Sequence, residues 1–346
     1  MDASIEHDED SVARLARASL EAGRRQELAG RTDAAEVAYE AGWRYGAAAG
    51  DLQVESESLR RRAVIRHHQH RHFDAISMAQ QSLAAAVGAR VPELCAEAMN
   101  AIAGIHIDRG ELADARRVLG EALLPAAGLA PVLGKIEQNL GIVANIQGNL
   151  EAADEHFDRA LAAFGAVGDD RGRAVVYCNL GLVAIERRLW AEAEGFLDKG
   201  LTLAAGANDL RLIGICHLNR AEVLLGQGRY EAAREAVDLA RTFFHRIGSL
   251  AEEADAYHLS GRVYRATGRR DMAETMLKTA IELAQRSGAV RCEAESCRDL
   301  AEWIGEAGRV DDRDRYLARA RALFARLTAP IPLAQVEARI AELEAA

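Results

Sequence analysis

Apolar residues recur at intervals of three and four positions along almost the whole chain, with polar residues between them. This spacing gathers the apolar side chains on one face of an α-helix. Proline, which interrupts helices, occurs only five times in 346 residues, and short turns separate the amphipathic segments. The pattern therefore predicts an all-α chain of helices joined by tight turns.

The helical pattern repeats every forty residues between residues 132 and 327. Asn139-Leu140-Gly141 returns as Asn179-Leu180-Gly181 and, more loosely, as Asn219-Arg220-Ala221. The positions in phase are a small residue in the first helix (Gly141, Gly181, Ala221, Gly261, Ala301), a turn residue (Gly148, Arg188, Gly228, Gly268, Gly308) and an alanine in the second helix (Ala153, Ala193, Ala233, Ala273). Looser upstream copies have their turns near Gly110, Arg71 and Gly30. We expect about eight helical hairpins, each with a helix A and a helix B.

The repeats predict an organisation in four parts. Residues 1–10 are expected to form an acidic flexible tail, residues 11–92 degenerate hairpins, and residues 93–327 the regular array. Two prolines then interrupt the pattern, and residues 328–346 are expected to form a capping helix. A single hairpin cannot bury both of its apolar faces, so neighbouring hairpins must stack into an elongated α-solenoid.

The small residue inside helix A needs a physical reason. Glycine in a helix interior costs about 1 kcal/mol relative to alanine, yet glycine or alanine occupies this phase in five successive units. We expect that the absence of a large side chain lets helix A lie tightly against helix B of the same hairpin.

These residues resemble the tetratricopeptide repeat (TPR). That family has a Leu-Gly pair in helix A, a turn glycine seven residues later, and Ala, an aromatic residue and Ala in helix B, a pattern that residues 139–161 match almost completely. The unit is longer than usual, as in the repeats of bacterial signalling regulators and of Pins-type and kinesin-light-chain adaptors. The resemblance implies a right-handed superhelix in which helices A line a concave groove that binds a protein or peptide.

The resemblance also implies that residues around the Leu-Gly pair contact the partner. On this chain they include three asparagines at one phase, Asn139, Asn179 and Asn219, together with Gln138 and Asn145. A carboxamide both donates and accepts hydrogen bonds, so it can pair with a peptide backbone of any sequence. The alternative is that each asparagine bonds a neighbouring helix end or solvent.

The same surface becomes cationic farther along the chain. Its basic residues are His258, Arg262, Arg265 and Arg298. The planar guanidinium fork suits a carboxylate or a phosphate, so this half of the groove is a candidate site for an acidic segment. The alternative is that these arginines pair with flanking glutamates at positions 222 and 302.

Composition and charge exclude several classes of partner. A net charge of −10 and a pI near 5.6 argue against nucleic acid and anionic membranes as partners. The five cysteines are odd in number and scattered on apolar helical faces, as expected of a reduced protein rather than a disulfide framework. No signal-peptide or membrane-spanning apolar stretch is found, so we expect a cytoplasmic protein, and the resemblance to bacterial TPR regulators implies a bacterial one.

Catalytic and metal-binding signals are weak. The motifs GxxxxGK[ST], HExxH and GxSxG are absent, so we expect neither an enzyme nor a cofactor. A histidine run over residues 67–72 holds four of the ten histidines, but a turn separates His68 from His72 and only Asp74 is near as a further ligand. We expect surface histidines and no metal site, with metal binding and pH sensing as alternatives.

Two functions fit the repeats. The first is a non-enzymatic scaffold or adaptor that binds a protein or peptide segment in the concave groove. The alternative is a sensor that binds a signalling peptide or small molecule and controls a separate effector protein, because the repeats leave no room for a helix-turn-helix or ATPase segment. Oligomerisation through the ends of the array is a third option.

Overall fold

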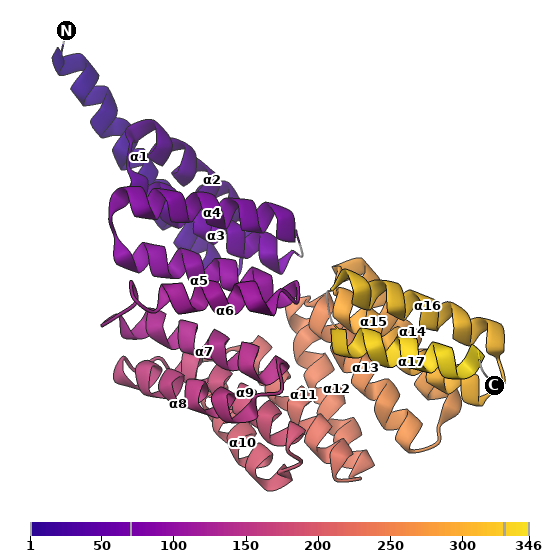
Figure 1. The fold of residues 1–346 in the computed structure, drawn as a ribbon. Helices are drawn as coiled ribbons and strands as arrows, with labels where there is room; N and C mark the ends of the chain where they lie inside the picture. Colours follow the sequence, from indigo (N-terminus) through magenta and orange to yellow (C-terminus); the bar gives the residue numbers. More distant parts are fainter. Residues whose placement is uncertain (1, 70, 328–329, 345–346) are drawn as a thin grey trace. The chain divides into compact units, whose positions relative to one another are not determined.

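The computed structural model describes residues 2–69, 71–327 and 330–344. Within these ranges the secondary structure consists of seventeen α-helices without strands, so the predicted all-α class is confirmed. The chain divides into two compact units, residues 1–143 and 144–346, which we describe separately. Figure 1 shows the helices in chain order.

Unit 1 is a stack of antiparallel hairpins that ends in part of a longer helix. Residues 2–10, expected as a flexible tail, belong to the first helix, and the division expected after residue 92 falls at the first residue of the fifth helix. The helices are α1 (Asp2–Leu28), α2 (Thr32–Ala49), α3 (Leu52–His68), α4 (His72–Ala89), α5 (Pro92–Asp108), α6 (Leu112–Ala122) and α7 (Ala130–Ile146), which crosses the unit boundary.

Unit 2 contains four hairpins in strict register, preceded by one helix and followed by another (Figure 1). Helices A of these hairpins begin at residues 170, 210, 250 and 290, forty residues apart, as predicted. The helices are α8 (Leu150–Ala166), α9 (Asp170–Glu186), α10 (Trp190–Gly206), α11 (Leu210–Gly226), α12 (Tyr230–Ile247), α13 (Leu250–Ala266), α14 (Arg270–Ser287), α15 (Val290–Glu306), α16 (Val310–Arg326) and α17 (Pro330–Glu344).

The turn inside each hairpin of unit 2 requires a left-handed backbone. Gly228 and Gly268 have φ angles of 75° and 72°, a region in which glycine has no steric penalty. Arg188 occupies the same phase with φ of 58°, which costs a residue with a Cβ about 1–2 kcal/mol. The recurrence of glycine at this phase therefore follows from the turn geometry.

The small residue of helix A makes close contact with helix B of its own hairpin, as predicted. A Cβ atom on Gly261 would lie 2.6 Å from Cγ of Leu277, and one on Gly181 would lie 2.9 Å from Cδ2 of Leu197. Both distances are too short for real atoms, so these glycines let the two helices approach.

In the hairpin of α11 and α12, a different pair of residues fits the limited space between helix A and helix B. Ala221 stands at the glycine position there, and the residue at the leucine position is the smaller Val237. Both side chains are buried in one apolar cluster that also includes Ala256 of α13, the next helix A. Neighbouring hairpins thus share one continuous core, as expected of a solenoid.

Sulfur also takes part in the packing between hairpins. Cys178 of α9 and Cys216 of α11 are both buried, with their Sγ atoms 3.0 Å apart. The hydrogen bond with the Cys216 thiol, together with burial, raises the pKa of Cys178, so the Cys178 sulfur is packed as a neutral thiol. Within the described residues all five cysteines are free.

The pairing of a small with a large residue can be tested by exchanging it. Gly261→Ala should destabilise the protein, because the added methyl group overlaps Leu277 and overpacking costs about 1–3 kcal/mol. In the Leu277→Val background the same change should stabilise, by up to about 1 kcal/mol, because alanine is the better helix former. Urea unfolding of the four proteins measures this reversal. The same sign in both backgrounds would contradict the close-contact explanation.

Candidate functional site

One face of helices A lines a groove within unit 2. Residues four and three positions apart lie on the same side of a helix, and in α13 this spacing brings together Asp255, Leu259 and Arg262. The groove has a volume of about 880 Å³. Its walls come from α9 (Glu186), α11 (Leu218, Asn219, Glu222), α13 (Asp255, His258, Leu259, Arg262), α15 (Arg291, Glu295, Arg298, Asp299, Glu302), α16 (Leu317) and α17 (Gln335, Val336, Arg339).

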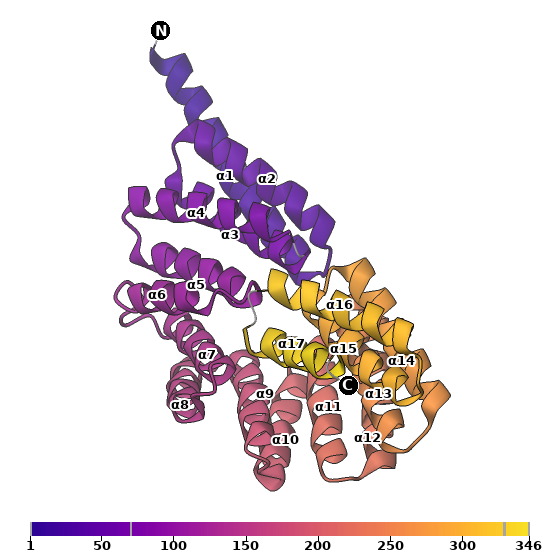
Figure 2. The ribbon, with the colours of Figure 1, turned by 45° about the vertical axis from the view of Figure 1, so that its right-hand side comes forward.

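The capping helix α17 forms part of this groove. Val336 is buried in a cluster with Leu300 of α15 and Leu317 of α16, while Gln335 and Arg339 line the groove. In Figure 2, α17 lies beside α15 and α16. The groove is therefore closed at this end by a helix outside the repeat pattern.

Two asparagines of the predicted ladder carry buried amide nitrogens without hydrogen-bond partners among the described residues. These are Asn179 on α9 and Asn219 on α11. The Asn219 side chain lines the groove, and the residue is only 8% exposed. An unsatisfied buried donor costs about 1–3 kcal/mol, and native structures retain few of them. Such a donor in a groove wall points to an acceptor on a ligand.

His258, Arg298 and Asp299 form a buried network on the groove floor. His258 Nε2 and Asp299 Oδ2 are 2.8 Å apart, and Arg298 donates from Nε and Nη2 to Asp299 Oδ1, each at 3.0 Å. Burial disfavours the Asp299 carboxylate, but the hydrogen bond from His258 and the charges of His258 and Arg298 prevail and lower its pKa to about 2.

Arg262 in the groove and Arg265 one turn beyond it are paired with carboxylates of neighbouring repeats. Arg262 Nη1 donates to Glu222 Oε1 at 2.7 Å. Arg265 donates to Glu302 at 2.9 Å and to Glu306 at 3.1 Å. Burial opposes the charge of Arg262, but the Glu222 carboxylate outweighs it and raises the Arg262 pKa.

Carboxylates outnumber arginines along the groove. Among its lining residues are six carboxylates, at positions 186, 222, 255, 295, 299 and 302, and four arginines, at positions 262, 291, 298 and 339. Asp255 and Glu295 make no ion pair within 4.0 Å with any described residue. The groove surface is therefore mildly acidic, whereas the sequence predicted a cationic surface here.

Family comparison agrees with this architecture. Sequence profiles described as tetratricopeptide repeat match residues 95–124, 133–205 and 215–286. The chain belongs to the tetratricopeptide repeat family.

Among characterised proteins, the TPR chain is similar to the regulatory protein AfsR of Streptomyces griseus. The two are 31% identical over 133 residues, which are 38% of this chain and 14% of AfsR. The chain thus corresponds to a small part of that regulator's length.

Solved structures share the fold over most of the TPR chain. A Rap protein complexed with competence and sporulation factor aligns with a TM-score of 0.62 at 16% identity, over 81% of this chain and 80% of that one. Aspartyl phosphate phosphatase F from Bacillus subtilis aligns with a TM-score of 0.63 at 14% identity, over 82% of this chain and 74% of that one. These TM-scores show that the fold is shared, and the predicted α-solenoid of TPR hairpins is confirmed.

The predicted TPR ladder of asparagines does not act as one set. Asn139 lies in unit 1, where its Nδ2 donates to Oδ1 of Asn100 on α5 at 2.9 Å. This bond is the structural alternative that the sequence left open. Gln138 precedes it in unit 1, whereas Asn145 lies in unit 2 and has a buried Oδ1 without a hydrogen-bond partner among the described residues.

Of the nine residues predicted to contact a partner, the groove brings four together: Asn219, His258, Arg262 and Arg298. Arg265 is one turn beyond Arg262 and is not part of the groove lining. Sequence reasoning missed Asp255 and Glu295, although both stand four positions before the ladder phase and so share its helical face.

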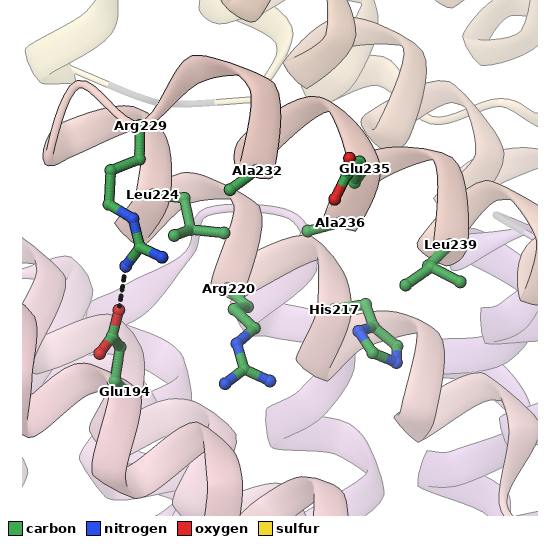
Figure 3. Close-up of a pocket in the computed structure, with 9 residues that line it drawn as sticks. All are labelled: Glu194, His217, Arg220, Leu224, Arg229, Ala232, Glu235, Ala236 and Leu239. Carbon is green, nitrogen blue, oxygen red and sulfur yellow. Dashed lines mark hydrogen bonds and ion pairs between the residues drawn. The ribbon is translucent and has the colours of Figure 1, made fainter.

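A second, smaller hollow of about 400 Å³ lies between α10 and α12, over α11 (Figure 3). Both of its arginines bind carboxylates of the chain: Arg229 reaches Glu194 at 3.4 Å, and Arg220 reaches Asp198 at 3.0 Å. Burial, with a contribution from Arg220, lowers the pKa of His217, whose ring stacks on Phe243 at 5.8 Å between centroids. This hollow offers a ligand fewer unsatisfied polar groups than the groove.

The histidine run lies at the turn between α3 and α4, and His70 is outside the described residues. His67 Nε2 is 2.5 Å from Asp108 Oδ2, and the His67 and His72 rings are 5.6 Å apart. Among the described residues, no group of three or more metal-ligating side chains comes together. The helices in the described ranges include none that is long and apolar enough to cross a membrane.

Asp299 makes stability depend on pH in a defined window. Its folded pKa of about 2 lies below the ordinary value of 3.8, so its contribution of about 2 kcal/mol is present above pH 4 and is lost as the pH falls toward 2. Asp299→Asn should therefore destabilise the protein at pH 7 and much less at pH 3, as measured by urea unfolding. Asp158→Asn, at an exposed site on α8, is the control. A pH-independent difference would refute this assignment.

Proposed function

We propose that the groove of unit 2 binds an extended segment of a peptide or partner protein, and that the chain is a non-enzymatic interaction module. The observation that carries this proposal is the Asn219 amide, buried in the groove wall with no acceptor among the described residues. A peptide carbonyl supplies the missing acceptor, and it does so for any peptide sequence.

The repeat spacing suits an extended chain. Helices pack with axes about 8–10 Å apart, and an extended peptide advances about 3.3 Å per residue. A segment crossing from one helix A to the next therefore needs about three residues, and about nine residues span α9 to α15. Asn179 and Asn219, at the same position of successive helices A, would then bond carbonyls about three residues apart.

A regulatory role is favoured over a purely structural one. The chain is similar to a regulatory protein, AfsR, and its fold is shared with a Rap protein complexed with competence and sporulation factor. In this version the bound segment is a signal that changes the activity of an effector. A passive adaptor remains the alternative, and a co-purifying effector distinguishes the two.

The bound segment is not proposed to be acidic. Arg262, Arg265 and Arg298 suggested such a partner from the sequence, but each already bonds a carboxylate of this chain. An acidic ligand would have to displace these carboxylates and leave them without their partners, which cancels most of the gain.

The asparagines can be tested with a fluorescent pool of degenerate nine-residue peptides. Asn179→Ala and Asn219→Ala should each weaken binding by about 0.5–1.5 kcal/mol, as measured by fluorescence anisotropy. Neither should lower the melting temperature, because the free protein loses no hydrogen bond of these amide nitrogens.

Asn139→Ala is the matched control for this experiment. It removes the bond to Asn100, so it should lower the melting temperature and leave peptide binding unchanged. Reduced melting with unaltered affinity in the Asn179 and Asn219 variants would instead assign these side chains a structural role and overturn the proposal.

A further inference from the structure

We propose that the part of the groove between α13 and α15 binds a basic side chain, arginine or lysine, of the bound segment, with Asp255 and Glu295 as its carboxylate partners. This inference rests on the proposed function and adds a chemical specificity to it. The three observations that support it are the position of the two carboxylates, the engagement of the nearby cations, and the unsatisfied Asn219 amide.

The two carboxylates occupy the same position in successive helices A. Asp255 is the sixth residue of α13 and Glu295 the sixth residue of α15, and both line the groove. The Glu295 charge adds to desolvation in raising the pKa of Asp255. Two carboxylates on adjacent helices can bind one guanidinium or ammonium group from both sides.

The cations nearest to this pair are largely engaged elsewhere. Arg298 and His258 bond Asp299, and Arg262 bonds Glu222. Arg291 is close enough to favour the Asp255 charge but makes no ion pair within 4.0 Å with a described residue. The site therefore has two carboxylates and one arginine, Arg291, that is not held in an ion pair with any described residue.

Asp255 shows the electrostatic consequence. Asp255 is exposed to the water of the groove, although the helices that form the groove lie around it. The partial loss of hydration near these helices raises its pKa to about 6, despite a hydrogen bond from Cys292 and the charges of Arg291 and His258. Because few positive charges lie close to this carboxylate, binding of a cation would stabilise its charged form.

The Asn219 amide independently indicates a ligand in the same groove. The residue is 8% exposed, and its Nδ2 lacks an acceptor among the described residues. Asn219 belongs to α11, the helix A before α13. An extended peptide needs about three residues to cross from one helix A to the next. A segment whose carbonyl accepts from Asn219 would therefore place a side chain about three residues away at Asp255.

The experiment uses three pools of degenerate nine-residue peptides with arginine, its neutral isostere citrulline, or glutamate fixed at the central position. At pH 7.5 and about 50 mM salt, the protein should bind the arginine pool about tenfold more tightly than the citrulline pool, and the glutamate pool most weakly. Raising the salt to about 300 mM should reduce the preference, because the interaction is ionic.

Two matched variants locate the preference. Asp255→Asn should reduce the preference for arginine over citrulline at least threefold. Asp158→Asn removes one carboxylate at an exposed site on α8, outside the groove lining. It should leave the preference within twofold. Melting temperatures of both variants verify that the fold is intact.

The outcomes separate this inference from the proposed function. If all pools bind equally and Asn219→Ala still weakens them, the groove binds peptides but the basic-residue site is wrong. A preference for the glutamate pool would also overturn it, in favour of the acidic partner suggested by the arginines. If none of the pools binds, or if Asn219→Ala has no effect on binding, the proposed function fails and this inference fails with it.

Discussion

The contact between a small residue on helix A and a large residue on helix B is the constraint on which this structure depends. Gly181 and Gly261 leave no room for a methyl group beside Leu197 and Leu277. This contact fixes how one helix rotates against the other in each hairpin. Once that rotation is fixed, the polar residues of helix A must emerge on the opposite side. The groove is thus a by-product of a packing rule that repeats every forty residues.

Stability and recognition are separated within the groove. Most of its charges stabilise the stack, because Arg262 and Asp299 bond residues of neighbouring repeats. A smaller set contributes little to folding: the amide of Asn219 is unsatisfied, and Asp255 remains without a full counter-charge. Natural proteins keep unfavourable groups of this kind where they serve another purpose, commonly the binding of a ligand.

The fold was predictable from the sequence and the site only partly. Apolar spacing and the phase of glycine depend on local geometry, so they predicted the hairpins and the contact at Gly261 directly. The role of an asparagine depends on its neighbour in the adjacent repeat: Asn139 finds Asn100, whereas Asn219 finds no acceptor within the described residues. The wall formed by α17 was not predictable because this helix lies outside the repeat phase.

The strict register also has a mechanical consequence. Contacts in unit 2 join each hairpin to its neighbours, so tension applied to the chain ends acts on one interface at a time rather than on the whole core. Each detached hairpin would release forty residues, about 130–140 Å of extended chain. A pulled molecule would therefore lengthen in equal steps, and a ligand held across several helices A would act as a clamp that raises the force of each step.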